Sequence, residues 1–240
     1  MRAQFYTLVF VFCACIGHAQ SHEGKTYDVR QLYGDLNTRD FHNVGFFYAS
    51  AVLDAGLNSK FVSPKTEGSP LLFDDWNNQG VIVMGDKKYH FNNLNYNISR
   101  DEFMSKINND SVFVFDLSNI DKIIVGNKQF KQLYDSGERK NKIYEVIYEN
   151  DNFSLLKDYF IITTEGSPNP MLNRPNDKIV KKSTYFIMRN NSIEPFGWSK
   201  RSIVNLIDKE KKEEFKKYVK KNNLSYRDES DVRTMLKYFL

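Results

Sequence analysis

Residues 80–163 alternate short apolar segments with polar clusters, and this alternation limits the fold more than any other feature of the sequence. Short apolar runs bounded by Asn, Asp, Gly and Lys are typical of strands that follow one another in an antiparallel sheet. The sequence therefore predicts a twisted antiparallel β-meander, in the form of a half-barrel or a sandwich. The expected strands are residues 81–84, 94–98, 112–115, 120–125, 144–148 and 153–162.

The pattern changes from strand to helix near residue 199. A loop with three prolines covers residues 166–177, and one further strand is expected at 181–188. Apolar residues then recur at helical spacing, for example Phe215 and Val219, and Asp228 can cap a last helix. We therefore expect an α+β, mainly β protein, with a β-rich body at 61–198 and helices packed on it at 199–240. The expected helices are residues 202–207, 210–221 and 228–239.

The first 19 residues resemble a signal peptide. Arg2 precedes an apolar run at 5–16, and Gly17-His18-Ala19 places small residues at a cleavage site before Gln20. The apolar run is too short for a membrane-spanning helix, which needs about 20 residues. We expect export to the periplasm, the outer membrane or the medium, with no transmembrane segment once residues 1–19 are removed. A soluble body is favoured over a membrane barrel, because adjacent charges such as Lys87 and Lys88 occupy both faces of expected strands.

Both cysteines, Cys13 and Cys15, lie in this predicted signal peptide. The mature chain would then have no disulfide, Cys nucleophile or thiolate metal site. Acylation of Cys15 is an open alternative, although the residues before it fit a lipoprotein pattern poorly. Residues 20–60 stay open in type, because the apolar stretch at 41–57 fits a helix and a strand equally well.

Charge argues against nucleic acid as a partner. The chain has 34 Lys and Arg against 30 Asp and Glu, for a net charge of +4. That balance is not the charge pattern of a dedicated nucleic-acid binder. The basic segment 209–221 is interrupted by Glu210, Glu213 and Glu214, and a solvated helix face explains it.

Four segments of the chain carry a resemblance to known proteins. The segments are Gly-Ser-Pro-Leu-Leu-Phe-Asp-Asp at 68–75, Leu-Asn-Tyr-Asn-Ile at 94–98, Ile-Val-Gly-Asn-Lys-Gln-Phe at 124–130 and Tyr-Val-Lys-Lys-Asn-Asn-Leu at 218–224. They resemble a family of exported, uncharacterised proteins common in Bacteroidota. This resemblance implies export and a single β-rich body over residues 68–240. It implies no reaction and no catalytic residues.

The best metal candidate is a calcium-like loop. Asp75, Asn77 and Gln79 stand at loop positions 1, 3 and 5, Gly80 at position 6 and Asp86 at position 12. The match is incomplete, since Gln and Asp replace the usual residues at positions 5 and 12, and residues 81–84 resemble a strand. A turn that enters a β-strand is the favoured interpretation of this segment.

No stretch carries a catalytic motif or a cofactor motif, so we predict no catalytic residues and no cofactor. The sequence has no His-Glu-x-x-His pair, Gly-x-Ser-x-Gly elbow or Gly-rich phosphate loop. Pairs of acids such as Asp74 and Asp75 could serve glycosidic chemistry only if the fold sets a suitable separation. A non-enzymatic protein is therefore favoured.

Binding of a protein or glycan in the cell envelope is the expected function. Exposed aromatic residues often anchor binding surfaces, and Trp76 and Trp198 are the candidates, provided that they are not core residues. Two alternatives stay open. One is a carboxylate-dependent hydrolase of glycans or peptides, and the other is a structural subunit of an envelope complex.

Overall fold

The computed structural model describes residues 49–53, 66–106, 111–167 and 176–240. The predicted signal peptide, Cys15 and most of residues 20–60 lie outside these ranges, and so does most of the proline-containing loop. Within the described residues, no helix is long and apolar enough to cross a membrane.

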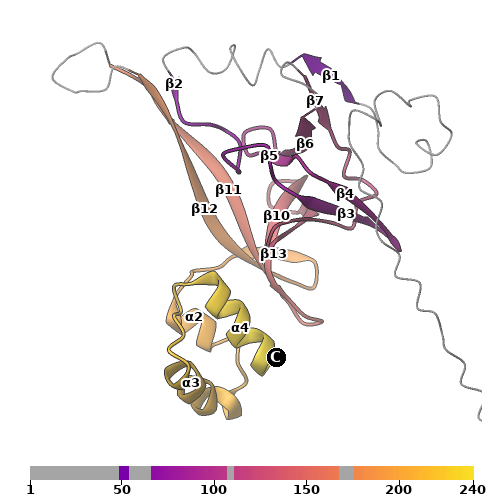
Figure 1. Ribbon diagram of the computed structural model, residues 1–240. Helices are drawn as coiled ribbons and strands as arrows, with labels where there is room; N and C mark the ends of the chain where they lie inside the picture. Colours follow the sequence, from indigo (N-terminus) through magenta and orange to yellow (C-terminus); the bar gives the residue numbers. More distant parts are fainter. Residues whose placement is uncertain (1–48, 54–65, 107–110, 168–175) are drawn as a thin grey trace, which may run out of the picture.

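Most of the described strands form one large sheet (Figure 1). Neighbours in this sheet are antiparallel, except that β2 (Thr66–Glu67) pairs parallel with β12. The order is β13 (Ser192–Pro195), β12 (Asp177–Arg189), β11 (Ser154–Thr164), β10 (Lys140–Glu149), β9 (Lys128–Asp135), β8 (Lys122–Val125), β3 (Gly80–Met84) and β4 (Lys87–Phe91).

A small antiparallel sheet forms the second layer. Its order is β1 (Ala49–Leu53), β7 (Ser111–Val114), β6 (Glu102–Lys106) and β5 (Leu94–Asn97). The open question about residues 41–57 is settled in part, because 49–53 form a strand, whereas the remainder lies outside the described residues.

The mainly β fold with antiparallel sheets and C-terminal helices is confirmed. The meander is interrupted, however, because the chain leaves the large sheet after β4, builds β5 to β7 and returns with β8 against β3. From β8 to β13 each strand pairs with the next. Short turns fit this order, for example Asn190 and Asn191 with φ of 48° and 61° between β12 and β13.

The main core lies between the two sheets. Aromatic side chains of both layers pack there, with the ring centroids of Phe103 and Phe130 5.1 Å apart. Phe91, Tyr96, Phe103 and Phe130 are each about 1% exposed or less. Burial of this apolar surface holds the small sheet against the part of the large sheet that contains β3, β4, β8 and β9.

The C-terminal helices cover the other end of the large sheet (Figure 1). They are α2 (Lys200–Val204), the 3₁₀ turn η2 (Lys209–Lys211), α3 (Lys212–Lys221) and α4 (Glu229–Phe239). Asp228 caps α4 as expected, accepting a hydrogen bond from the Asp231 N–H at 3.0 Å. Arg233 fixes α4 to the sheet by donating to the Ile147 and Asn127 carbonyls.

Candidate functional site

The large sheet splits between β10 and β11. Paired residues run from Glu149 and Ser154 to Glu145 and Lys157, and the pairing stops there. Beyond Lys157, β11 continues to Thr164 and pairs only with β12 among the described strands (Figure 1). The split leaves an open groove of about 610 Å³ lined by residues 98–102, 140–142 and 159–161 together with Tyr96 and Gln132.

The backbone of β11 faces this groove with unpaired groups. The Ile143 N–H donates to Asp101 at 3.2 and 3.3 Å, so it points away from β9. Backbone groups alternate in direction along a strand, so the N–H and C=O groups of Glu145 also point towards β11, where Glu145 pairs with Lys157. The same alternation turns the N–H and C=O groups of Tyr159, Ile161 and Thr163 into the groove. No described strand pairs with them on that side.

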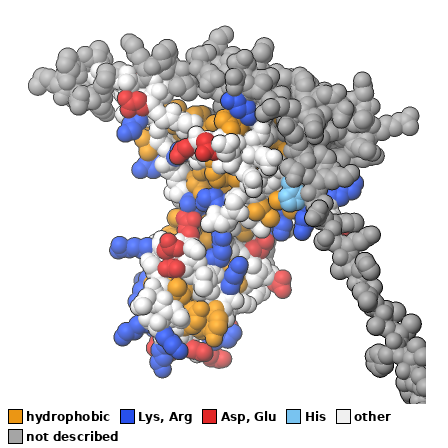
Figure 2. Space-filling view, viewed as in Figure 1, with side chains coloured by type: hydrophobic (Ala, Val, Ile, Leu, Met, Phe, Trp, Pro, Cys, Tyr) orange, Lys and Arg blue, Asp and Glu red, His pale blue; other side chains and the backbone are white. Residues whose placement is uncertain are grey.

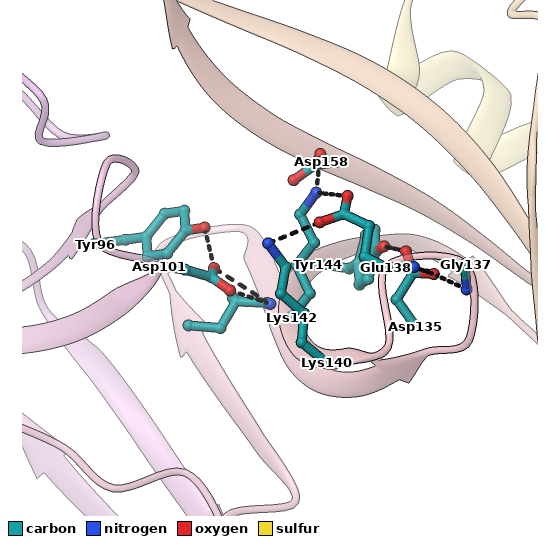
Figure 3. Close-up of polar contacts among 10 residues, drawn as sticks. Tyr96, Asp101, Asp135, Gly137, Glu138, Lys140, Lys142, Tyr144 and Asp158 are labelled. Atoms are coloured by element: carbon teal, nitrogen blue, oxygen red, sulfur yellow. Dashed lines mark hydrogen bonds and ion pairs between the residues drawn. The ribbon is translucent and has the colours of Figure 1, made fainter.

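Asp101 forms the floor of the groove from the turn between β5 and β6. Its φ of 57° is a left-handed conformation, uncommon for a residue other than Gly. Its carboxylate accepts from the Tyr96 hydroxyl at 2.6 Å and from the Ile143 N–H (Figure 3). Burial raises the pKa of Asp101 above its ordinary value, although these two hydrogen bonds act in the opposite direction. Asp101 thus occupies the place that a strand carbonyl would take.

Lys142 connects the groove to a second carboxylate. Its ammonium donates to Asp158 Oδ2 at 2.7 Å and to Glu138 Oε1 at 2.9 Å (Figure 3). Asp158 is 4% exposed, and its Oδ1 has no hydrogen-bond partner among the described residues. Burial raises the pKa of Asp158 despite the ion pair with Lys142, and the charge of Asp101 adds to the rise.

The hairpin between β9 and β10 is fixed by Asp135. Its carboxylate accepts from the Tyr144 hydroxyl at 2.7 Å and from the Gly137 and Glu138 N–H groups (Figure 3). The hydrogen bond from Tyr144 is the main reason that the pKa of Asp135 lies below its ordinary value. This closed turn holds Glu138 where it can pair with Lys142.

On the opposite face of β10, Glu145 joins the strands at the point of the split. Its buried carboxylate accepts from Lys128 Nζ at 2.9 and 3.0 Å and from the Tyr159 hydroxyl. Tyr159 belongs to the first residues of β11 beyond the pairing, so this contact fixes where the two strands separate. Burial is the main cause of the raised pKa of Tyr159, and the Glu145 charge contributes.

Apolar side chains flank the free edge of β11. Phe160 is 40% exposed and Ile162 is 46% exposed, and both project from the same face because side chains alternate along a strand. Their position next to unpaired backbone groups gives the groove both main-chain partners and an apolar surface.

The structure does not bring the calcium-like residues together. Asp75 accepts a hydrogen bond from the Asn77 N–H, which makes a local turn. Gln79 precedes β3 and Asp86 follows it, so the five-residue strand, about 16 Å long at the usual rise per residue, separates them. Gly80 has a packing role instead, because a Cβ there would lie 2.6 Å from Leu94 Cδ1 and 2.7 Å from the Ile124 carbonyl. Within the described residues, no three His, Cys, Asp or Glu side chains form a metal-binding group.

The two tryptophans are half-buried and lie in different places. Trp76 packs against a small core cluster that includes Leu71 and Met104. Trp198 stacks on Tyr185 with ring centroids 4.3 Å apart, and its Nε1 is buried without a hydrogen-bond partner among the described residues. They do not form one aromatic surface. The other acids singled out in the sequence, Asp74 and Asp75, are exposed, and Asp74 pairs with Lys181.

Asp101, Lys142 and Asp158 belong to no sequence motif. Asp101 and Ile143 are 42 positions apart, and no local pattern places them together. One signal was present, since Glu102 follows Asp101 in a polar turn between two expected strands, but such turns occur throughout this chain.

Comparison with known proteins gives no match. Neither a family model, nor a curated protein, nor a solved structure matches the chain.

Proposed function

We propose that the protein binds an extended segment of a partner protein, which adds as a strand to the free edge of β11 in the groove. The unpaired groups of Tyr159, Ile161 and Thr163 carry this proposal. A sheet edge with free N–H and C=O groups is a template for another strand. In such complexes the main-chain hydrogen bonds give affinity and the side-chain contacts give selectivity.

The edge available for pairing is long enough for a specific peptide. It runs from Asp158 to Thr164, about 23 Å at the usual rise per residue. An added strand would place every second side chain beside Phe160 and Ile162. We therefore expect a segment in which apolar and polar residues alternate, with the apolar ones on the face of Phe160.

Export would place this activity in the cell envelope. The signal-peptide pattern at 1–19 supports export, and the partner would then be an envelope protein. Membership in the exported Bacteroidota family is part of the same proposal. A glycan ligand is the alternative occupant, and glycans in the binding screen would identify it.

The test compares two substitutions at Thr163, a position exposed to solvent. Thr163→Pro removes one N–H that points into the groove and leaves the hydrogen bonds between β11 and β12 in place. Proline is tolerated on an edge strand at a position whose N–H has no partner in the sheet. Thr163→Val keeps the N–H and nearly the same shape. Peptides of alternating pattern are first selected from a library, and their affinities are measured by calorimetry.

Thr163→Pro is expected to weaken the binding of the selected peptides about fivefold to tenfold, which corresponds to the net contribution of one hydrogen bond. Thr163→Val is expected to bind as the wild type does. Equal affinities for the Pro and Val variants, or selection of glycans and no peptides, would refute the proposal. Hydrogen exchange of the complex gives a second readout, because added pairing protects the N–H groups of Tyr159 and Ile161.

A carboxylate-dependent hydrolase is the second candidate, and one observation favours it. Asp101 lines the groove, Asp158 pairs with the groove residue Lys142, and burial raises the pKa of both carboxyl groups. A raised pKa is what a general acid requires. Hydrolysis of a peptide or glycan panel that disappears in Asp101→Asn would support this candidate, and uncleaved peptides that still bind would favour the first.

A further inference from the structure

A hollow of about 520 Å³ lies on the helical end of the molecule, away from the groove. Its wall contains Val219 and Leu224 and the ring of Tyr226. Lys200, from α2, and Lys216 and Lys220, from α3, supply its charged groups, and no carboxylate lines it. Lysines from two separate helices thus border one hollow that also has apolar side chains in its wall.

These ammonium groups are incompletely neutralised within the described residues. Lys216 pairs with Glu213 at 2.6 Å, whereas Lys220 has no ion pair among the described residues. Lys200 lies over the Tyr226 ring, with its Nζ 5.3 Å from the ring centroid. Lys216 and Lys220 are four positions apart on one helix, where like charges repel each other. A bound anion would remove this repulsion.

The charge of the whole molecule is concentrated at the same end. Residues 199–240 contain twelve Lys and Arg against seven Asp and Glu, of the 34 and 30 in the full chain. The excess positive charge of the protein therefore comes from this part. Figure 2 shows Lys and Arg side chains, with Asp and Glu among them, around an apolar patch at the helical end. Such a field attracts anions.

We propose that this hollow binds an oxyanion group, carboxylate, phosphate or sulfate, that is attached to an apolar or aromatic body. Lys200 and Lys220 would donate to the anion, because charge-assisted bonds to ammonium are the strong ones. Val219, Leu224 and Tyr226 would contact the body of the ligand. Lysines at the end of α3 also offset the helix dipole, but that role gives no reason for Lys200 of α2 to lie at the same place.

Binding is tested with the full chain by NMR titration at constant ionic strength. The probes are inorganic phosphate, phenyl phosphate, benzoate and glucuronate, which separate the anion from the body that carries it. Saturable shifts are expected at Val219, Leu224 and Tyr226, with phenyl phosphate tighter than inorganic phosphate. Shifts spread evenly over the lysines, or absent from these three residues, would overturn the proposal.

Three exposed lysines provide matched variants. Lys200→Gln and Lys220→Gln are each expected to weaken the binding of phenyl phosphate about tenfold, because each removes one charged hydrogen bond. Lys221→Gln removes a neighbouring charge on α3 that does not line the hollow, and we expect less than a twofold change. An equal loss in Lys221→Gln would show a general charge effect and reject the site. This test is independent of peptide binding at β11.

Discussion

Glu145 on β10 lies directly opposite Lys157 on β11, and this is the last residue pair that joins the two strands. Glu145 also holds Lys128 and Tyr159 beneath the pair, so one buried carboxylate fixes where the sheet opens. From this pair towards Thr164, β11 has a free edge. From this pair towards Ser154, the sheet supports the helices. The proposed peptide site therefore depends on a local polar contact within a continuous sheet.

Glu145→Ala is expected to lower the free energy of unfolding by about 3 kcal/mol, because the Lys128 ammonium and the Tyr159 hydroxyl lose their buried partner. Urea unfolding followed by fluorescence measures this change. Glu149→Ala is the matched control on the same strand. Its ion pair with Lys131 is exposed, and we expect a loss below about 1 kcal/mol. Equal losses would contradict the role given to Glu145.

Glu229→Gln is expected to lower stability at pH 7 by about 2 kcal/mol, because Glu229 accepts from Lys157 and the Tyr185 hydroxyl where α4 meets the sheet. Burial acts to raise the pKa of Glu229, but these contacts outweigh it and hold the pKa below 4.5. A carboxyl with a lowered pKa stabilises the fold above its unfolded pKa, and this contribution disappears as the pH falls through the folded pKa.

The difference between wild type and Glu229→Gln should therefore shrink as the pH falls below 4.5. Urea midpoints at pH 7, 5, 4 and 3 give this comparison. Glu214→Gln, at an exposed position of α3 with no ion pair in the described residues, is the control and should change the stability by less than about 0.5 kcal/mol. A constant difference at every pH would contradict the ionic role of Glu229.

Asp158→Asn should show the opposite pH dependence. Burial raises the pKa of Asp158 above 3.8, so the folded state holds its proton more tightly than the unfolded state. Its contribution to stability therefore falls as the pH rises from about 3.8 through the folded pKa. The stability of Asp158→Asn relative to wild type should rise over this interval, as measured by urea unfolding. A relative stability that falls with pH would show that the ion pair with Lys142 dominates instead.

The sequence predicted the element types well where the apolar period was strong. The expected strand at 81–84 is β3, and the expected start of the last helix at Asp228 is its N-cap. Polar strands were missed, above all β9 with its sequence Lys-Gln-Phe-Lys-Gln-Leu-Tyr-Asp, because its buried face carries few apolar side chains. Pairing with its neighbours β8 and β10 holds β9 in the sheet, and local strand propensity does not contain information about such pairing.

The candidate site could not be predicted, because it depends on long-range register. The groove exists only because pairing between β10 and β11 stops at Lys157 while β11 extends to Thr164. Both strands were expected from apolar residues, but nothing in either sequence marks the last pair. Trp76 and Trp198 are binding candidates by residue type, yet the structure places them apart and half-buried.

Gly80→Ala is expected to destabilise the protein by about 1–3 kcal/mol, because the added methyl would overlap Leu94 Cδ1 and the Ile124 carbonyl. Gly197→Ala is the control, because its φ is not left-handed and the nearest atom to the new Cβ, Ser202 Oγ, lies 3.9 Å away, so we expect a smaller loss. Thermal unfolding with and without Ca²⁺ tests the calcium-like loop in the same samples. A melting temperature that rises on addition of Ca²⁺ would favour the metal site over the packing role of Gly80.

Replacing both Phe160 and Ile162 by Thr is expected to weaken selected alternating peptides about tenfold and to change stability little. Both side chains are partly exposed, and Thr keeps a high strand propensity, so β11 should persist. The peptide would lose two cross-strand apolar contacts beside its main-chain bonds. Tyr134→Thr is the control, because Tyr134 is 59% exposed on β9 and does not line the groove. Calorimetry should show unchanged affinity for this control. If the double variant also binds as wild type does, selectivity does not come from the apolar face of β11, and the pairing would have to be mediated by the main chain alone.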